Sequence, residues 1–416
     1  MSYTGVSDKA ASQSTFAGRS DGLMPYVPPK LRSSTMTLPK TGLINFGVTC
    51  YMNSTIQALS ATTPMTMLFL SDEFKRAVQR NWKGSKGVMP ELYSNLIRSL
   101  WKGDVSSIKP TTFRTFCGRL NSDWKNDVQQ DAKQFLEFMI ETLHEDLNAN
   151  WDRTILQNLT PQQEAFRENL PKYLASKREW QRHRHREHSP IYDLFGGQTM
   201  SRLRCRSCSF VSTTWEFFSS ISVEIPHAAP AATLDQCLAQ FCRDEPLGGE
   251  ERWICPRCKV HREATKQITF TRLPQYLVVH LKRFRNDDYG RAARKLHTVI
   301  DFPLRGLDMS PYTLPPPDAA EQQRIASLAA PQEKAPDPAM TPPYSYDAYA
   351  VLQHIGGDLT HGHYTTAVRD RMKRVWRKYN DTVVREIDPA GLQNKEAYIL
   401  FYERTAAAGA EGGGRL

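Results

Sequence analysis

The stretch GLINFGVTCYMNS at residues 42–54 decides the fold, because it places Cys50 at the predicted start of a helix that runs to Ser60. Unpaired backbone N–H groups in the first turn of a helix favour a thiolate over a thiol. A lone cysteine is usually a small buried hydrophobe. A second segment, HGHY at residues 361–364, changes that interpretation because it supplies His363 directly after a glycine. A cysteine, a distant histidine and a later amide or carboxylate are the parts of a thiol protease.

The base of such a site needs an acceptor at its second ring nitrogen. Asn380 and Asp381 stand 17 and 18 residues after His363, a separation that suits a β-hairpin returning beside the histidine strand. Asn45 stands five residues before Cys50. Its side-chain amide is a candidate donor, with the N–H of Cys50, to the oxyanion formed on a scissile carbonyl.

The composition of the 416 residues is that of a globular protein, with 40% hydrophobic and 24% charged residues. This length predicts one catalytic domain of several lobes. No apolar run approaches the roughly 20 residues that span a bilayer, and the first residues lack the pattern of a secretory signal. Eight cysteines without such a signal indicate a reducing compartment, where thiols serve metals and catalysis.

The formal net charge of +10 is concentrated in two basic clusters, at residues 177–186 and 369–378. One interpretation is an acidic partner, an anionic membrane surface or RNA. The other is a solvated helix face and a hairpin loop. The second is favoured, because neither cluster carries a stacking or groove-binding motif.

The order of patterns along the chain predicts the elements of the fold. Residues 134–147 place apolar side chains on one face of a helix, and residues 159–187 predict a helical segment charged on most faces and largely exposed. Short strands are expected between residues 191 and 271, and two secure strands at 276–281 and 397–402.

Three segments have the composition of loops or tails. Residues 1–40 are predicted to be a flexible arm, and residues 405–416 a disordered tail. The Pro- and Ala-rich residues 308–344 predict an insertion loop rather than a core element.

Two Cys-x-x-Cys pairs form a separate motif, Cys205 with Cys208 and Cys255 with Cys258. Paired knuckles of this kind supply four thiolates for one structural zinc ion, and an arginine inside each knuckle would offset their charge. A metal-free relic and redox chemistry are the alternatives, although a redox pair needs only one such motif in a βαβ context. Cys117, Cys237 and Cys242 lack partner spacing and are predicted to be core residues.

Several blocks together resemble the ubiquitin-specific proteases, in family order across residues 42–404. They are the segment around Cys50, QQDA at 129–132, VHLKRF at 279–284, the segment 354–364 and AYILFY at 397–402. The resemblance implies an α+β, papain-like thiol protease with fingers, palm and thumb lobes. It places a thumb at 42–151, a helical connector at 152–190, a zinc-binding β-rich fingers lobe at 191–272 and a palm at 273–404, all within a catalytic domain of residues 41–404.

The resemblance also implies roles for individual residues. The nucleophile would be Cys50, the general base His363, the third member Asn380 with Asp381 beside it, and the oxyanion donor Asn45. Residues matching positions that hold the ubiquitin tail are Gln130, Asp131, Gln134, Phe284, His354, Gly362 and Tyr364. His354 alone is also consistent with a hydrogen-bonded strand histidine, and Phe284 with core packing.

Two positions depart from the family pattern. Val48 stands where the family usually has asparagine, and Gln134 where it usually has glutamate. Loss of a charge-assisted bond at Gln134 would weaken substrate binding by roughly 1–3 kcal/mol. An active enzyme with a weaker grip on its substrate is expected.

The implied function is a deubiquitinase that cleaves after the C-terminal glycine of ubiquitin, in isopeptide or peptide linkages, through an acyl-enzyme. A catalytically silent ubiquitin-binding scaffold is the alternative, and a nucleic-acid-binding zinc module is a third. Segments 143–148 and 193–198 resemble members that act in endosomal sorting. The expected location is cytoplasmic. Recruitment to endosomal membranes through other proteins and association with the nucleus are both left open. No nucleic-acid partner and no transmembrane segment are expected.

Overall fold

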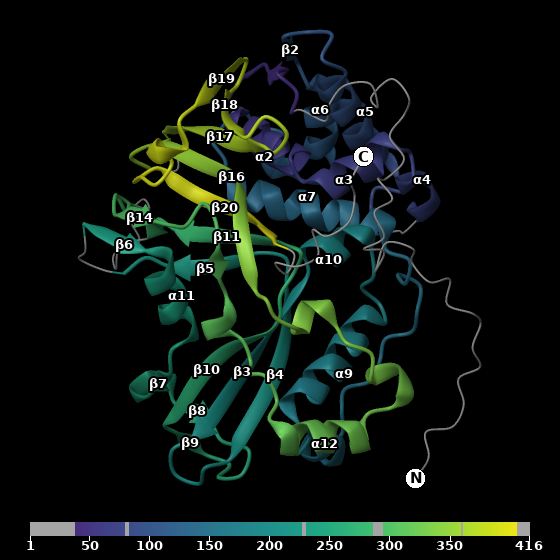
Figure 1. The fold of residues 1–416 in the computed structure, drawn as a ribbon, viewed down its shortest axis with the longest axis vertical. Helices are drawn as coiled ribbons and strands as arrows, with labels where there is room; N and C mark the ends of the chain where they lie inside the picture. The colour runs from purple at the N-terminus through teal and green to yellow at the C-terminus, as the bar shows by residue number, and fades with distance from the viewer. Residues whose placement is uncertain (1–37, 80–82, 227–229, 286–293, 359–360, 406–416) are drawn as a thin grey trace, which may run out of the picture.

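The computed structural model describes residues 38–79, 83–226, 230–285, 294–358 and 361–405. Helices gather at one end of the molecule, an eight-stranded sheet crosses its middle, and a four-stranded sheet extends to the opposite end (Figure 1). This is the mixed helix-and-sheet architecture that the sequence predicts. The predicted arm and tail lie outside the described residues, apart from residues 38–40 and 405.

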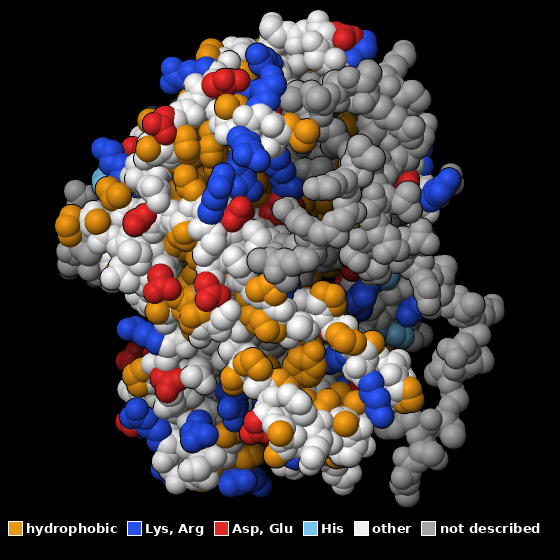
Figure 2. Space-filling view, in the orientation of Figure 1, with side chains coloured by type: hydrophobic (Ala, Val, Ile, Leu, Met, Phe, Trp, Pro, Cys, Tyr) orange, Lys and Arg blue, Asp and Glu red, His pale blue; other side chains and the backbone are white. Residues whose placement is uncertain are grey.

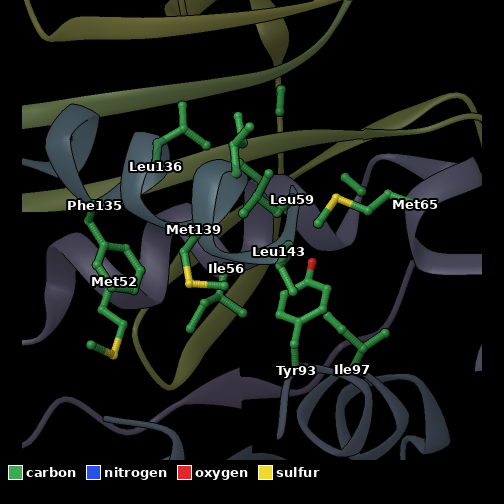
Figure 3. Close-up of a cluster of buried hydrophobic side chains, with 14 of the residues drawn as sticks. Met52, Ile56, Leu59, Met65, Tyr93, Ile97, Phe135, Leu136, Met139 and Leu143 are labelled. Atoms are coloured by element: carbon green, nitrogen blue, oxygen red, sulfur yellow. The ribbon is translucent and has the colours of Figure 1, made fainter. Parts of the chain in front are cut away.

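The first hydrophobic core lies at the helical end of the molecule. Its helices are α2 (Cys50–Ser60), α3 (Thr63–Leu70), α4 (Phe74–Ala77), α5 (Val88–Lys102), α6 (Thr111–Leu120) and α7 (Ala132–Leu147), joined by a two-stranded sheet of β1 (Gly42–Leu43) and β2 (Ser107–Ile108). Phe135, Leu136, Met139 and Leu143 of α7 are fully buried, as the 3.6-residue spacing predicts. Figure 3 shows them packed against side chains of α2 and α5.

The central sheet has two buried faces. Its strand order is β19 (Val383–Ile387), β18 (Val375–Asn380), β17 (Gly362–Asp370), β16 (Ser345–Gly356), β20 (Ala397–Arg404), β11 (Tyr276–Lys282) and β5 (Ile221–Glu224), with β15 (Leu307–Asp308) beside β16. Strand β20 supplies Tyr398 and Phe401 to the helix-side core and Leu400 and Tyr402 to the opposite core. The unbroken apolar run at 397–402 is therefore a strand buried on both faces.

The four-stranded sheet has the order β4 (Val211–Phe218), β3 (Gly197–Cys205), β10 (Ala264–Arg272) and β7 (Glu245–Leu247). Three two-stranded pairs complete the β structure: β8 (Trp253–Ile254) with β9 (His261–Arg262), β6 (Ala231–Thr233) with β14 (Val299–Asp301), and β12 (Phe284–Arg285) with β13 (Arg294–Lys295). A helix that the sequence analysis missed, α11 (Leu234–Cys242), lies within this region. Its signal was a capping box, in which Thr233 and Gln236 bond reciprocally.

The predicted connector, residues 152–190, contains α8 (Pro161–Glu168) and α9 (Lys172–Arg184), and α10 (Pro190–Phe195) begins at its last residue. The prediction of a largely exposed segment was wrong for α9, where Leu174, Ala175 and Trp180 are buried. The insertion covers Leu174 and Ala175, which share a core cluster with Ala329, whereas Trp180 stacks on Phe217 of β4. The buried ammonium of Lys177 donates to the carbonyl oxygens of Glu333 and Ala335, 2.6 Å from each.

The insertion at 308–344 is more ordered than predicted. It contains α12 (Ala319–Leu328) and three short 3₁₀ turns, at Ser310–Tyr312, Pro331–Glu333 and Pro338–Met340. The prediction that it is not a core element was also wrong at its ends, because Met309, Tyr312 and Tyr344 belong to the second core. Proline restricts the unfolded chain, so a Pro-rich segment loses less entropy when it becomes ordered.

The basic clusters are mostly bonded within the molecule, which neither interpretation anticipated. Arg178 pairs with the carboxylate of Glu333 at 2.9 Å, and Arg184 with Asp193 at 3.1 Å. The second cluster makes three ion pairs and one hydrogen bond within the molecule: Arg369–Asp347, Arg371–Glu403, Arg377–Asp370 and, for the hydrogen bond, Lys378–Gln353. These contacts place much of the excess positive charge in structural roles. None of the described helices combines the length and the apolar composition that a transmembrane span requires.

Candidate active site

The predicted nucleophile, Cys50, is the first residue of α2 and is 1% exposed. A closed turn sets this position, because Asn45 Oδ1 accepts from the backbone N–H of Thr49 at 2.9 Å and from its hydroxyl at 3.1 Å. Gly47 within the turn has φ +73°, and a Cβ there would lie 2.1 Å from a carboxylate oxygen of Asp127. Only glycine fits, so the turn that presents the thiol depends on this residue.

The predicted base, His363, lies near the start of β17, which packs on α2. Its Nε2 lies 2.6 Å from Asn380 Oδ1 on β18. Hydrogen bonding to Cys50, opposed by burial and assisted by Asn380, raises the pKa of His363 to about 9. The imidazole therefore lies between a thiol and an amide oxygen, and this arrangement favours its protonated form.

Asp381 differs in position from its neighbour Asn380. Its carboxylate lies 3.8 Å from His363 Nε2, which is too long for a hydrogen bond. Instead, its two oxygens accept from the side-chain amides of Asn53 at 2.8 Å and Asn45 at 3.1 Å. Asp381 thereby fixes Asn45, the predicted oxyanion donor, whose amide nitrogen carries a second hydrogen.

Gln129 is a residue that sequence reasoning missed. Its side-chain Nε2 lies 3.6 Å from the Sγ of Cys50. By contrast, the amide of Gln130, which the sequence analysis selected, donates to the carbonyl oxygen of Asp123 at 2.9 Å. The signal was present in the QQDA block, but only the path of the loop decides which glutamine faces the thiol.

Asp131 caps the N-terminus of α7, accepting from the backbone N–H of Lys133 at 2.7 Å. The hydroxyl of Tyr398 on β20 also donates to this carboxylate, at 2.8 and 2.9 Å from its two oxygens. Burial raises the pKa of Asp131, and these hydrogen bonds oppose the rise. The carboxylate is thus fixed between the helical end and the central sheet, beside the predicted tail-binding residues.

Gln134 and Val48, the two departures from the family pattern, have little local role. Gln134 is exposed on the first turn of α7, and its side chain makes no hydrogen bond to any residue that the structure describes. Val48 is half-buried in the turn before Cys50. Neither side chain disturbs the contacts of Cys50, His363 or Asn380.

An aromatic cluster joins four strands beside Asp131. The ring centroid of His354 lies 5.0 Å from that of Phe284 and 4.8 Å from that of Tyr364, and Phe284 lies 5.5 Å from Tyr398. Burial lowers the pKa of His354 to about 4, so the ring is neutral at physiological pH. Neither of its nitrogens has a hydrogen-bond partner among the described residues, so the alternative of a hydrogen-bonded strand histidine was wrong.

The glycines near His363 are required by strand packing. A Cβ at Gly362 would lie 2.2 Å from the Nε2 of His354, and Gly356 has φ +127° with its Cα facing Gly362 across the strand pair. Gly357 has open space. Close approach of β16 to β17 therefore explains Gly356 and Gly362 without any ligand.

The four knuckle cysteines meet at the end of the four-stranded sheet. The sulfur atoms of Cys205, Cys208, Cys255 and Cys258 all lie within 4.8 Å of one another. The sulfurs of Cys208 and Cys255 are 3.6 Å apart, close to the about 3.8 Å expected between tetrahedral ligands at 2.3 Å from zinc.

Both knuckles have the same backbone turn. Ser209 and Lys259, each one residue after a knuckle, both have φ +57°, and their N–H groups donate to the carbonyls of Cys205 and Cys255. Two separate turns with one geometry fit a four-thiolate metal site. The cluster is therefore able to hold a metal ion.

A mixed α/β fold with a cysteine at a helix N-terminus, facing a histidine on an adjoining sheet, defines the papain-like class of thiol protease. The family model for ubiquitin carboxyl-terminal hydrolases matches residues 41–402. The chain belongs to this family.

Curated relatives carry the same family name. The chain is 36% identical over 372 residues to ubiquitin carboxyl-terminal hydrolase 4 of Saccharomyces cerevisiae, covering 87% of this chain and 39% of that protein. It is 33% identical to probable ubiquitin carboxyl-terminal hydrolase 4 of Schizosaccharomyces pombe, covering 88% of this chain and 58% of the relative. The chain thus spans from 39% to 58% of the length of these relatives.

Solved structures share the fold. The SAGA Ubp8/Sgf11/Sus1/Sgf73 DUB module bound to ubiquitin aldehyde matches with a TM-score of 0.64 at 22% identity, covering 90% of this chain and 71% of that chain. A variant of the same module bound to monoubiquitin gives a TM-score of 0.62, also at 22% identity, covering 88% and 69%.

Proposed function

We propose that this chain is a cysteine-type deubiquitinase that hydrolyses the bond after the C-terminal glycine of ubiquitin. The observation that carries the proposal is the convergence of Cys50, His363 and Asn380, which come from α2, β17 and β18. Membership of the ubiquitin carboxyl-terminal hydrolase family supports the reaction class. Ubiquitin aldehyde and monoubiquitin are bound in the solved structures that share the fold, which supports ubiquitin as the substrate.

In the proposed reaction, the Cys50 thiolate attacks the carbonyl of the terminal glycine and a thioester acyl-enzyme forms. His363, protonated and oriented by Asn380, gives its proton to the leaving lysine amine. It then removes a proton from the water that hydrolyses the thioester. The N–H of Cys50 and the amide of Asn45, held by Asp381, stabilise the oxyanion. Gln129 is a further donor within reach of the reacting atoms.

The substrate tail would lie along the aromatic cluster of Phe284, His354, Tyr364 and Tyr398. Asp131 at one end of this cluster presents a carboxylate that accepts hydrogen bonds, which suits the backbone N–H groups of an extended peptide. His354, Tyr364 and Tyr398 are buried, so a tail beside them would have to be narrow, and a Gly-Gly tail is the narrowest. Gln130 and Gln134 would contribute at the rim.

The metal proposed for the four cysteines is one structural zinc ion. Four thiolates and no open ligand position are typical of structural rather than catalytic zinc. The ion would fix the tip of the four-stranded sheet, since β3 ends at Cys205 and β10 begins at Ala264, the register partner of Cys205. Its role would be to support the surface that holds ubiquitin.

The experiment that tests the proposal is release of a fluorophore from the ubiquitin C-terminus by the purified chain. Cys50→Ala should abolish turnover, whereas Cys242→Ala, which replaces a partly buried cysteine outside the site, should retain it. Absence of turnover by a folded, zinc-loaded parent would contradict the proposed deubiquitinase activity. If that protein still bound ubiquitin, the silent scaffold would be the better description.

The proposal extends to a cytoplasmic location, with recruitment to endosomal membranes through other proteins. Residues 143–148 and 193–198 support it only by resemblance. Fluorescence microscopy of the tagged chain in its host cell tests it, and an exclusively nuclear signal would contradict it.

A further inference from the structure

Two irregular loops flank Cys50 in the candidate active site. The first, residues 44–49, leads from β1 to Cys50 and carries Asn45. The second, residues 125–131, leads to α7 and carries Gln129. The amides of Asn45 and Gln129 are the proposed donors to the reacting atoms, so their positions depend on how the two loops are held together. A misplacement of about 1 Å at a reacting centre can lower a rate by roughly 100-fold.

Arg114, on α6, donates hydrogen bonds to both loops. Its Nη1 donates to the carbonyl oxygen of Phe46 at 3.1 Å, and the guanidinium carbon lies 5.1 Å from the centroid of the Phe46 ring. Its Nη2 donates to the carbonyl oxygen of Asn126 at 3.3 Å and to the carboxylate of Asp127. A Cβ at Gly47 would lie 3.4 Å from Nη1, so the guanidinium lies directly against the turn before the thiol. One side chain therefore fastens the first loop to the second.

The bonds to the two carbonyl oxygens carry this link. Lys and Arg side chains are spread over the face drawn in Figure 2, often beside Asp or Glu. The side chain of Arg114 differs from these because it is only 13% exposed, whereas that of its ion-pair partner Asp127 is 68% exposed. A pair with an exposed carboxylate contributes little because water screens it. The bonds to the carbonyl oxygens need no second charge, and a bond from an ionised donor is roughly twice as strong as a neutral one.

We propose that Arg114 is a positioning residue for the deubiquitinase reaction, which holds the amides of Asn45 and Gln129 where the oxyanion forms. It acts through the two loops and does not touch the substrate. The planar guanidinium suits this role because it donates in two directions at once, whereas a lysine ammonium is a single point charge. The inference rests on the proposed function. Removing one oxyanion donor lowers kcat by roughly 10²–10³-fold, so loosening the donors without removing them should lower it by about tenfold.

Steady-state kinetics of fluorophore release from the ubiquitin C-terminus test the inference. Arg114→Met keeps the length of the side chain and removes its donors, and it should lower kcat by about tenfold. Arg114→Lys should lower kcat by only about threefold, because an ammonium reaches one loop. Ubiquitin should bind Arg114→Met and the parent equally, each in a Cys50→Ala background, since Asp131 is held separately by α7 and Tyr398. The matched control is Arg119→Met, which replaces an exposed arginine on the same helix and should retain kcat.

A double-mutant cycle separates positioning from a general loss of structure. If Arg114 acts through Asn45, Arg114→Met should lower kcat by less than about threefold in an Asn45→Ala background, where that donor is already gone. Alkylation of Cys50 by iodoacetamide forms no oxyanion and depends on the thiolate, so it should proceed at the parent's rate in Arg114→Met. An equal fold loss of kcat in both backgrounds, or alkylation slowed as much as kcat, would overturn the inference.

The outcomes also separate this inference from the proposed function. No turnover by the folded parent would contradict the deubiquitinase activity and the inference together. Turnover by the parent with an unchanged kcat in Arg114→Met would overturn the inference alone, and so would an equal loss in Arg119→Met. If thermal unfolding shows that Arg114→Met does not fold, Arg114→Lys decides, and an unchanged kcat in that variant would overturn the inference.

Discussion

Replacing Asn380 with leucine should separate orientation of the imidazole from the chemistry of the thiol. The side chain of Asn380 makes one contact to the site, from Oδ1 to Nε2 of His363 at 2.6 Å. Leucine has nearly the same size but no acceptor. The substitution therefore removes the hydrogen bond with little change in volume.

The magnitude follows from the charge and the exposure of the partner. A hydrogen bond to a charged group contributes about 1.5–3 kcal/mol. The side chain of His363 is 34% exposed, so water screens the bond and the lower end applies. A loss of about 1.5 kcal/mol corresponds to roughly a tenfold fall in kcat/KM. Because one pKa unit is about 1.4 kcal/mol, the pKa of His363 should also fall by about one unit from its value of about 9.

The sign of the pH effect is fixed by the direction of the pKa change. The imidazolium is needed beside the thiolate, so activity is lost as pH rises through the pKa of His363. In Asn380→Leu the alkaline limb of kcat/KM should move to lower pH, and in Asn380→Asp, which adds a negative charge, to higher pH. The assay is fluorophore release from the ubiquitin C-terminus between pH 6 and pH 10. An unchanged alkaline limb and unchanged kcat/KM in Asn380→Leu would refute the reasoning.

Three further changes test other parts of the structure. Gln134→Glu places a carboxylate at the third position of α7, where the helix dipole stabilises it by about 0.3–1 kcal/mol. The melting temperature should therefore rise, and KM for ubiquitin substrates should fall. A KM no lower than that of the parent would contradict the inference that Gln134 weakens substrate binding. Removal of metal by a chelator, or Cys258→Ser, should lower the melting temperature, and mass spectrometry of the parent should find one zinc ion per chain. A parent that holds no metal and is as stable as the chelator-treated protein would exclude the zinc site. Burial lowers the pKa of His280 to about 3 from an unfolded value of 6.5, so stability should be lost as pH falls below 6.5, by about 1.4 kcal/mol per pH unit from this residue alone. Urea unfolding at pH 7 and pH 5 should show a smaller loss for His280→Gln, and an equal loss would show that this histidine does not contribute.

Two elements that depend on a local apolar pattern were predicted correctly. Helix α7 and strand β20 follow from apolar spacing and from an unbroken apolar run, which are properties of a few consecutive residues. The two Cys-x-x-Cys knuckles indicated a four-thiolate cluster because each knuckle is itself a local turn. By contrast, the burial of α9 was missed, since the segment that covers it comes some 150 residues later in the chain.

The sequence by itself determined which residue types meet at the site: a thiol at a helix start, an imidazole after a glycine, and an amide on the next strand. The tertiary structure decided the partner of each one. Adjacent Asn380 and Asp381 point to different residues, and Gln129 rather than Gln130 faces the thiol. The physical reason is that a hydrogen bond depends on distances of a few tenths of an ångström and on direction, which are set by how α2, β17 and the loop before α7 pack together. Until that packing is in place, the sequence does not assign two adjacent side chains to particular partners.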